Sequence, residues 1–138
     1  MPPIDGELKI ADCVLYFTKG NITPAGVAQF YMVGDSVKRM ELTLSIKNIK
    51  NYDVFLQDGS CGDGVLHLDL TKNYFKNRNP IRSYPSEDGI NKVSVWTKNL
   101  DIQSDSKMNI NTKKIIIVKD YKIIACGSIV SNVVRITL

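Results

Sequence analysis

The residues best suited to chemistry in this 138-residue chain are one histidine, three cysteines and a few neighbouring acids. His67 and Asp69 are two residues apart, so an extended segment would place both side chains on one face. Structural zinc takes about four ligands, so a solvated or hydrogen-bonded pair explains these two residues better than a metal site. A single histidine also excludes a histidine-rich metalloenzyme.

The cysteines favour crosslinking over catalysis. Cys13, Cys61 and Cys126 are too few for a disulfide scaffold, and none has the C-x-x-C spacing of zinc or redox sites. At most one internal disulfide can form, and three reduced thiols are the alternative because the cytosol is reducing. Cys13 lies in an apolar run and is a core candidate, not a nucleophile. With no supported Ser/His/Asp set and no Gly-rich phosphate loop, we predict no catalytic residues and no cofactor.

Composition predicts one globular domain spanning residues 1–138, since 43% hydrophobic and 23% charged residues are ordinary values. The formal charge of +4 is scattered rather than gathered in a basic stripe, so we expect no nucleic-acid partner. No segment approaches the roughly 20 apolar residues needed to cross a bilayer, and the start does not resemble a secretory leader. We therefore expect a soluble, unsecreted protein without membrane contact.

The hydrophobic pattern has period two, and Met40 to Ile46 alternates apolar and polar residues without a break. Asp88-Gly89 and Asp120-Tyr121 are expected hairpin turns, and 65–80 and 99–112 are expected loops, the former with a short extended piece at 66–70. Many short strands without helical crossovers favour an antiparallel Greek-key sandwich or closed barrel. Eight strands are predicted, at 8–17, 27–33, 40–46, 52–56, 81–86, 90–98, 114–119 and 122–130.

Five collinear strings resemble the copper/zinc superoxide dismutase family, over most of the chain from about Ile10 to Val130. The strongest is Ile124-Ala125-Cys126-Gly127-Ser128-Ile129, which is similar to the family's Leu-Ala-Cys-Gly-Val-Ile in the last strand. Ala11-Asp12-Cys13-Val14-Leu15 resembles the family's Ala-Val-Cys-Val-Leu first strand, and the other matches lie at 45–49, 86–95 and 115–119. The resemblance implies an all-β, eight-stranded Greek-key β-barrel or sandwich of the copper/zinc superoxide dismutase type.

The same resemblance implies a disulfide between Cys61 and Cys126, which correspond to the cysteines of the family's intrasubunit bond. Such a bond would close a loop of about 65 residues and stabilise the fold by about 4 kcal/mol in the chain-entropy model. Cys13 would then be a free, buried thiol.

The family's metal ligands are missing from the matching positions. Where the family reads His-Val-His-Glu, this chain has Asp53 and Phe55 at the two ligand positions, and Val118 replaces the ligand histidine of the seventh strand. Ile123 stands where the family has the arginine that guides the anion, and Asp120-Tyr121 replaces its long electrostatic loop. The resemblance therefore implies a protein that binds neither copper nor zinc and is not an enzyme.

In this loss of ligands the chain resembles the virus-encoded, poxvirus-type members of the family. That likeness implies a protein partner, either the host copper chaperone, for which the chain would be a decoy, or virion proteins, in the infected cell's cytoplasm or the virion. Asp12 and Val14 are the candidate interface residues, although a carboxylate at Asp12 is costly within an apolar contact. A homodimer stays open. The alternatives are a packaging protein with an unrelated partner and residual metal-dependent dismutase activity.

Overall fold

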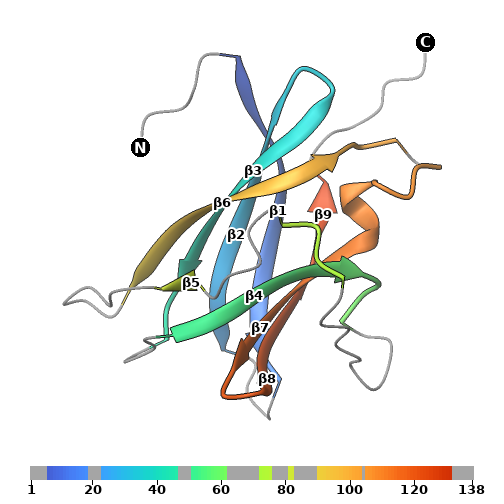
Figure 1. The fold of residues 1–138 in the computed structure, drawn as a ribbon. Coiled ribbons are helices and arrows are strands. Elements are labelled where there is room, and N and C mark those ends of the chain that lie inside the picture. The colour runs from blue at the N-terminus through green and yellow to red at the C-terminus, as the bar shows by residue number, and fades with distance from the viewer. Residues whose placement is uncertain are drawn as a thin grey trace.

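The computed structural model of the chain is a curled antiparallel β-sheet (Figure 1). It describes residues 6–18, 23–46, 51–61, 72–75, 81–82, 90–103 and 105–131. These residues form β1 (Glu7–Phe17), β2 (Pro24–Val33), β3 (Ser36–Leu44), β4 (Asn51–Asp58), β5 (Ile81–Arg82), β6 (Asn91–Leu100), the 3-10 helix η1 (Ile110–Thr112), β7 (Lys113–Lys119), β8 (Lys122–Ser128) and β9 (Val130–Ser131). The predicted all-β class is confirmed.

The strands follow the order β5-β4-β7-β8-β1-β2-β3-β6, with β9 also paired to β1, and every pair is antiparallel. The chain crosses from β3 to β4 and again from β6 to β7, so each half of the sheet contains strands from both parts of the sequence. Figure 1 shows the half containing β4 and β7 crossing in front of the half containing β1, β2 and β3. One core cluster contains side chains from both halves, which is the arrangement of a β-barrel or sandwich.

Alternation of side chains along the strands builds this core. On β3, Met40, Leu42 and Leu44 are fully buried while Glu41 and Thr43 are partly exposed, as the period-two pattern predicts. The strand begins at Ser36, earlier than predicted, because a tight turn ends β2. Gly34 has a φ of +61° there, a conformation that favours glycine.

Part of the predicted loop at 65–80 closes the barrel. The Tyr74 N–H donates to the Leu56 carbonyl of β4 at 3.0 Å, and the Lys98 N–H of β6 donates to the Tyr74 carbonyl at 2.7 Å. Phe75 is 1% exposed and forms a bridge with β6. Residues 72–75 therefore connect the two ends of the curled sheet, a role that the irregular sequence pattern did not indicate.

A buried lysine fixes the loops at this end of the barrel. The Lys113 ammonium lies 2.7 Å from an Asp58 carboxylate oxygen, donates to the Lys107 carbonyl at 2.6 Å, and sits 4.5 Å from the centre of the Tyr74 ring. Burial would raise the pKa of Asp58, but the hydrogen bond and charge of Lys113 outweigh it and the pKa lies below its usual value. This polar network satisfies a lysine whose side chain is fully buried.

The count and the limits of the strands differ from the prediction. The expected strand at 122–130 is divided, because Ile129 is buried and donates its N–H to the Lys113 carbonyl, so β8 ends at Ser128 and β9 begins at Val130. The expected loop at 99–112 is partly wrong, since β6 runs to Leu100 and η1 occupies its end. The described residues thus contain nine strands instead of eight, two of them only two residues long. Most of the expected strand at 81–86 and the piece at 66–70 lie outside the described residues.

Candidate functional site

The outer face of β4, β7 and β8 brings together the three positions that the resemblance assigns to metal ligands. Asp53 lies directly opposite Val118 across the β4–β7 pair, and Phe55 lies opposite Ile116. Because Val54 between them points into the core, the side chains of Asp53 and Phe55 point outward on the same face.

An apolar cluster occupies this outer face. Ile116 is 0% exposed and Val118 is 5% exposed, and Phe55, Cys61 and Ile123 pack against them. The strand β7 is consequently buried on both faces, unlike the half-exposed strands of the other half-sheet. Phe55 of β4 and Val118 of β7, which are far apart in the sequence, therefore both contribute packing at positions that the resemblance assigns to ligands.

The chemistry of these side chains does not fit copper or zinc, which take nitrogen, sulfur and oxygen donors. Asp53 alone among the three ligand positions offers a donor atom, since Phe55 and Val118 end in hydrocarbon. Across the described parts of the chain, no group of three or more His, Cys, Asp and Glu side chains could hold a metal ion. His67 and Asp69 lie outside the described residues.

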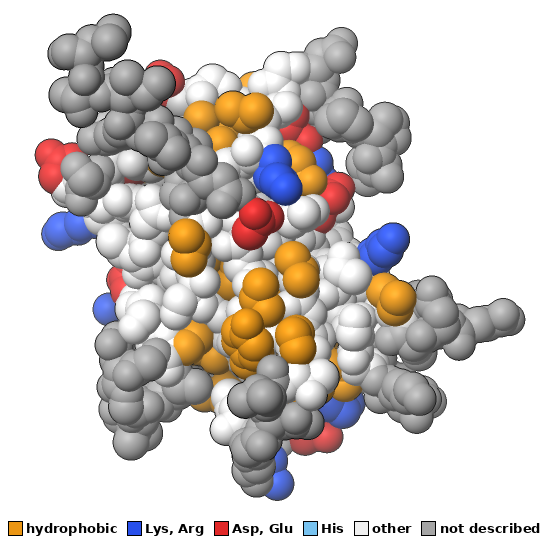
Figure 2. Space-filling model, turned by 180° about the vertical axis from the view of Figure 1, so that it is seen from behind, with side chains coloured by type: hydrophobic (Ala, Val, Ile, Leu, Met, Phe, Trp, Pro, Cys, Tyr) orange, Lys and Arg blue, Asp and Glu red, His pale blue; other side chains and the backbone are white. Residues whose placement is uncertain are grey.

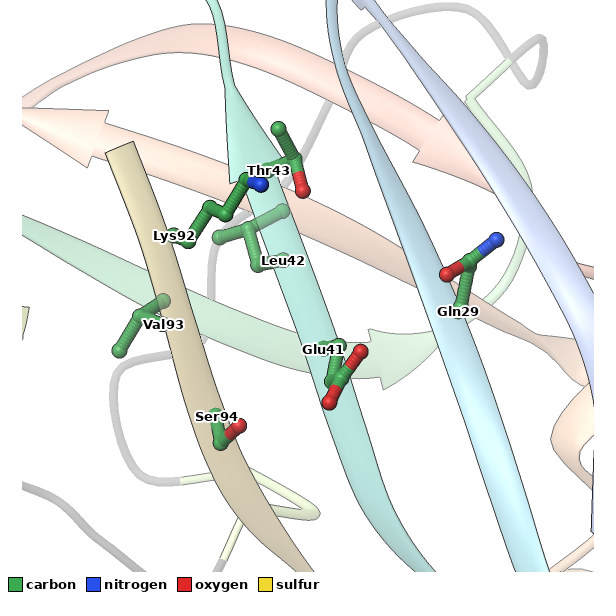
Figure 3. A pocket seen from close by; sticks show the side chains of 7 residues that line it. All are labelled: Gln29, Glu41, Leu42, Thr43, Lys92, Val93 and Ser94. Atoms are coloured by element: carbon green, nitrogen blue, oxygen red, sulfur yellow. The ribbon is translucent and has the colours of Figure 1, made fainter. Parts of the chain in front are cut away.

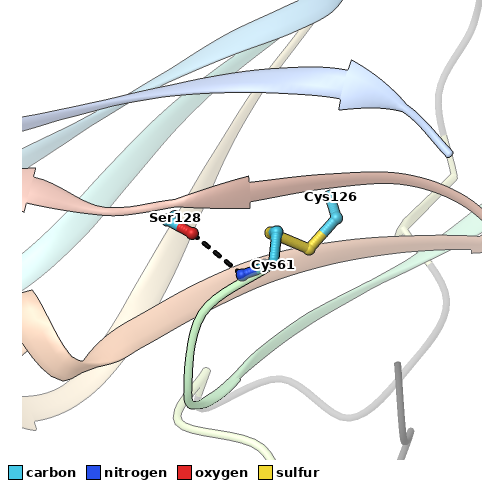
Figure 4. Close-up of a disulfide and its surroundings, with 3 residues drawn as sticks. All are labelled: Cys61, Cys126 and Ser128. Carbon is cyan, nitrogen blue, oxygen red and sulfur yellow. Dashed lines mark hydrogen bonds between the residues drawn. A yellow bond between two sulfur atoms is a disulfide. The ribbon is translucent and has the colours of Figure 1, made fainter. Parts of the chain in front are cut away.

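The structure joins Cys61 and Cys126 by a disulfide, as the resemblance implies (Figure 4). The bond links the turn after β4 to β8, and the Cys61 N–H donates to the Ser128 hydroxyl at 2.9 Å. Because Cys61 and Cys126 both belong to the outer cluster, the crosslink holds the cluster's edge in place. It spans 65 residues of sequence, which limits the freedom of the unfolded chain.

Cys13 is free and lies in the core on the other side of the sheet. Burial raises the pKa of its thiol to about 12, so the thiolate needed for nucleophilic chemistry does not form near neutral pH. A Cβ atom at Gly127 would come within 2.5 Å of the Cys13 sulfur, so a glycine is required at that position. Cys13 is therefore a packing residue.

The second candidate region is an apolar stripe on the outer face of β9, β1 and β2, made of Val14, Tyr16, Val27 and Val130. Val14 and Val27 are cross-strand partners, and their exposed fractions are both 38%. Tyr16 is 47% exposed and Val130 is 65% exposed. Figure 2 shows apolar side chains gathered on this side of the molecule. Contiguous exposed apolar side chains of this kind are typical of contact surfaces.

The predicted interface residues Asp12 and Val14 both lie at this stripe. Asp12 is the cross-strand partner of Val130, and its carboxylate forms an ion pair with Lys9 at 3.7 Å. The charge at the edge of the stripe is thus already paired within the chain. Sequence reasoning missed Tyr16, although its spacing from Val14 placed both on one face.

Comparisons with known proteins add no relatives: no protein-family model matches the chain, and no curated protein does. The described residues also contain no helix that is long and apolar enough to cross a membrane.

Proposed function

We propose that this chain is a non-catalytic binding protein built on a superoxide dismutase-like barrel. The observation that carries the proposal is the meeting of Asp53, Phe55 and Val118 on one outer face, where Phe55 and Val118 belong to an apolar cluster. Copper redox chemistry requires several imidazole or thiolate donors around the ion. A cluster of hydrocarbon side chains stabilises the fold instead.

The surroundings of this face support the same proposal. Asp120 and Tyr121 alone connect β7 to β8, so this connection cannot supply a charged rim that steers an anion. Ile123 packs against the cluster at the position where the resemblance expects a guiding arginine.

A protein partner would bind at the apolar stripe. Its four side chains lie on three adjacent strands and are flanked by the Lys9–Asp12 pair, which gives an apolar centre with a charged edge. The partner we propose is the host copper chaperone, with the chain acting as a decoy in the infected cell's cytoplasm. A second copy of the chain or a virion protein would use the same surface.

The proposed lack of catalysis is tested by metal analysis of the full chain, purified with copper and zinc supplied, alongside a dismutase assay. We expect metal far below one equivalent per chain and activity no higher than that of buffer. Stoichiometric copper together with dismutase activity would refute the proposal.

The partner is tested by direct binding of purified copper chaperone to the full chain. Val14→Lys should weaken binding at least tenfold because it places a charge in the apolar stripe. Val33→Lys is the matched control, since Val33 is a similarly exposed valine near the far end of β2. Equal binding by the two variants, or no binding by the unmodified chain, would remove the chaperone hypothesis.

A further inference from the structure

The outer face of β2, β3 and β6 carries a hollow of about 410 Å³, within the size range of small-molecule sites (Figure 3). Gln29, Glu41 and Ser94 form one cross-strand row along it, and Thr43 and Lys92 form the next. All five are polar side chains, and Leu42 and Val93 complete the lining. The hollow adjoins the apolar stripe, because Val27 is the cross-strand partner of Thr43.

The polar groups of the hollow are held on a rigid base. Arg39 is 5% exposed, its guanidinium lies 2.5 Å from a Glu41 carboxylate oxygen, and it also binds Glu7. The same guanidinium stacks on the Tyr31 ring at 4.4 Å from its centre. Glu41 is thereby held in place, and its second carboxylate oxygen can still accept hydrogen bonds.

An exposed indole lies beside the hollow. Trp96 is the cross-strand partner of Arg39 and is two residues from Ser94 on β6, so its side chain shares the outer face of the sheet with the hollow. It is 54% exposed, which leaves much of a large aromatic surface uncovered.

The donor set excludes several kinds of ligand. A phosphate or nucleotide would need converging Arg and Lys side chains, whereas Lys92 is the only cation among the described residues that line the hollow. A metal ion would need several ligands, whereas Glu41 is the only carboxylate that the described residues bring to the hollow, and it is bound to Arg39. An apolar ligand, such as an apolar side chain of another protein, would leave the hydroxyl, amide and ammonium groups of the hollow without hydrogen-bond partners.

A saccharide matches both parts of this surface. Its hydroxyl groups can donate to Glu41 and Gln29 and can accept from Lys92, while Thr43 and Ser94 can do either. The C–H face of a sugar ring can lie against the electron-rich face of an indole such as Trp96. We propose that the hollow and Trp96 together form a saccharide-binding site, which is independent of the missing metal ligands and of the chaperone partner.

The chain contains a single tryptophan, so its tryptophan emission, excited selectively over the six tyrosines, reports on Trp96 alone. We would titrate the full chain with cellobiose, lactose and chitobiose as neutral probes, and with sialyllactose and a heparin disaccharide as acidic probes. The proposal expects a saturable change in Trp96 emission with at least one probe, at millimolar or lower concentration. An acidic preference would point to Lys92 as a further contact. No saturable change with any of the five would overturn the proposal.

Variants locate the binding, measured by nuclear magnetic resonance titration so that the signal does not depend on the indole. Trp96→Ala should weaken saccharide binding at least tenfold, and Gln29→Ala or Ser94→Ala should weaken it by about fivefold, the usual effect of one hydrogen bond. Tyr121→Ala is the matched control, because Tyr121 is an exposed aromatic on the distant β7–β8 turn and should leave binding unchanged. Unchanged binding in Trp96→Ala, with the fold intact by its amide spectrum, would also overturn the proposal.

Discussion

The two outer faces of the same curled sheet have opposite character. On the face of β4, β7 and β8, which we call the closed face, Ile116 and Val118 are buried beneath neighbouring side chains and next to the disulfide. On the face of β9, β1, β2, β3 and β6, the open face, Val14, Val27 and Trp96 remain exposed beside polar rows. Both faces carry apolar side chains, but only on the closed face do neighbouring side chains cover them from solvent.

This difference associates the closed face with the stability of the fold and the open face with recognition of a partner or ligand. The closed face lies where the resemblance places a metal centre, and there Phe55 and Val118, at two of the positions that it assigns to ligands, contribute packing to the fold. The open face keeps apolar and polar groups available at the surface, a pattern suited to a partner or ligand.

The largest expected effect concerns the closed face's crosslink. Replacing both members, Cys61→Ser with Cys126→Ser, should lower the free energy of unfolding by about 4 kcal/mol, because it frees a long loop in the unfolded chain. Urea unfolding of the oxidised wild type and the double variant measures this difference. A loss below about 1 kcal/mol would show that the crosslink does not constrain the closed face.

Replacing a β-branched apolar residue by threonine should act very differently on the two faces. Ile116→Thr should lower the free energy of unfolding by about 3 kcal/mol, because it removes buried apolar volume and buries a hydroxyl. Val14→Thr keeps the β-branched shape at an exposed position and should cost less than about 0.5 kcal/mol. Chemical denaturation of both variants tests the contrast, and equal losses would contradict it.

Alkaline pH should weaken the fold through Cys13, which packs in the core behind both faces. Burial raises the pKa of its thiol from an ordinary value of 9.0 to about 12 in the folded chain, so the thiol ionises first in the unfolded state. The contribution of the buried neutral thiol to the stability of the fold is complete below pH 9. It is lost as the pH rises toward 12, at up to about 1.4 kcal/mol per pH unit. Between pH 8 and about 10.5, the free energy of unfolding should fall less steeply with pH for Cys13→Ala than for the unmodified chain. Equal slopes for the two proteins would show that the Cys13 thiol does not cause the loss of stability.

The smallest effect is expected at the end of the closed face, in the β7–β8 turn. Asp120 and Tyr121 have φ angles of +51° and +64°, and the Tyr121 side chain is 99% exposed. Tyr121→Gly should raise the free energy of unfolding by up to about 1 kcal/mol, because glycine adopts a left-handed conformation without the cost that a side chain incurs. Thermal unfolding measures the gain. A lower melting temperature would mean that the tyrosine stabilises the turn.

Much of the fold followed from local pattern. Alternation of apolar and polar residues predicted Met40, Leu42 and Leu44 as one buried row. Only two residues separate the last two long strands, which predicted the Asp120-Tyr121 turn. The Cys61–Cys126 bond required the family resemblance, because three cysteines allow several pairings.

Other features depend on neighbours that sequence does not reveal. Arg39 is buried on an outer face because Glu7, from a strand 32 residues away, binds its guanidinium. Val27 and Val130 resemble core residues by type, and only the register of β1 with its neighbours places them outside. Phe75 seals the barrel from within an irregular segment that has no periodic signal.

The contrast between the closed and the open face is tested most directly by methyl nuclear magnetic resonance with a soluble gadolinium chelate. We expect strong relaxation of the Val14, Val27 and Val130 methyl groups by the chelate and little relaxation of those of Ile116 and Val118. Equal relaxation of both sets would show that the outer face of β4, β7 and β8 is open to solvent, and would contradict the claim that packing fills the place where the resemblance puts a metal centre.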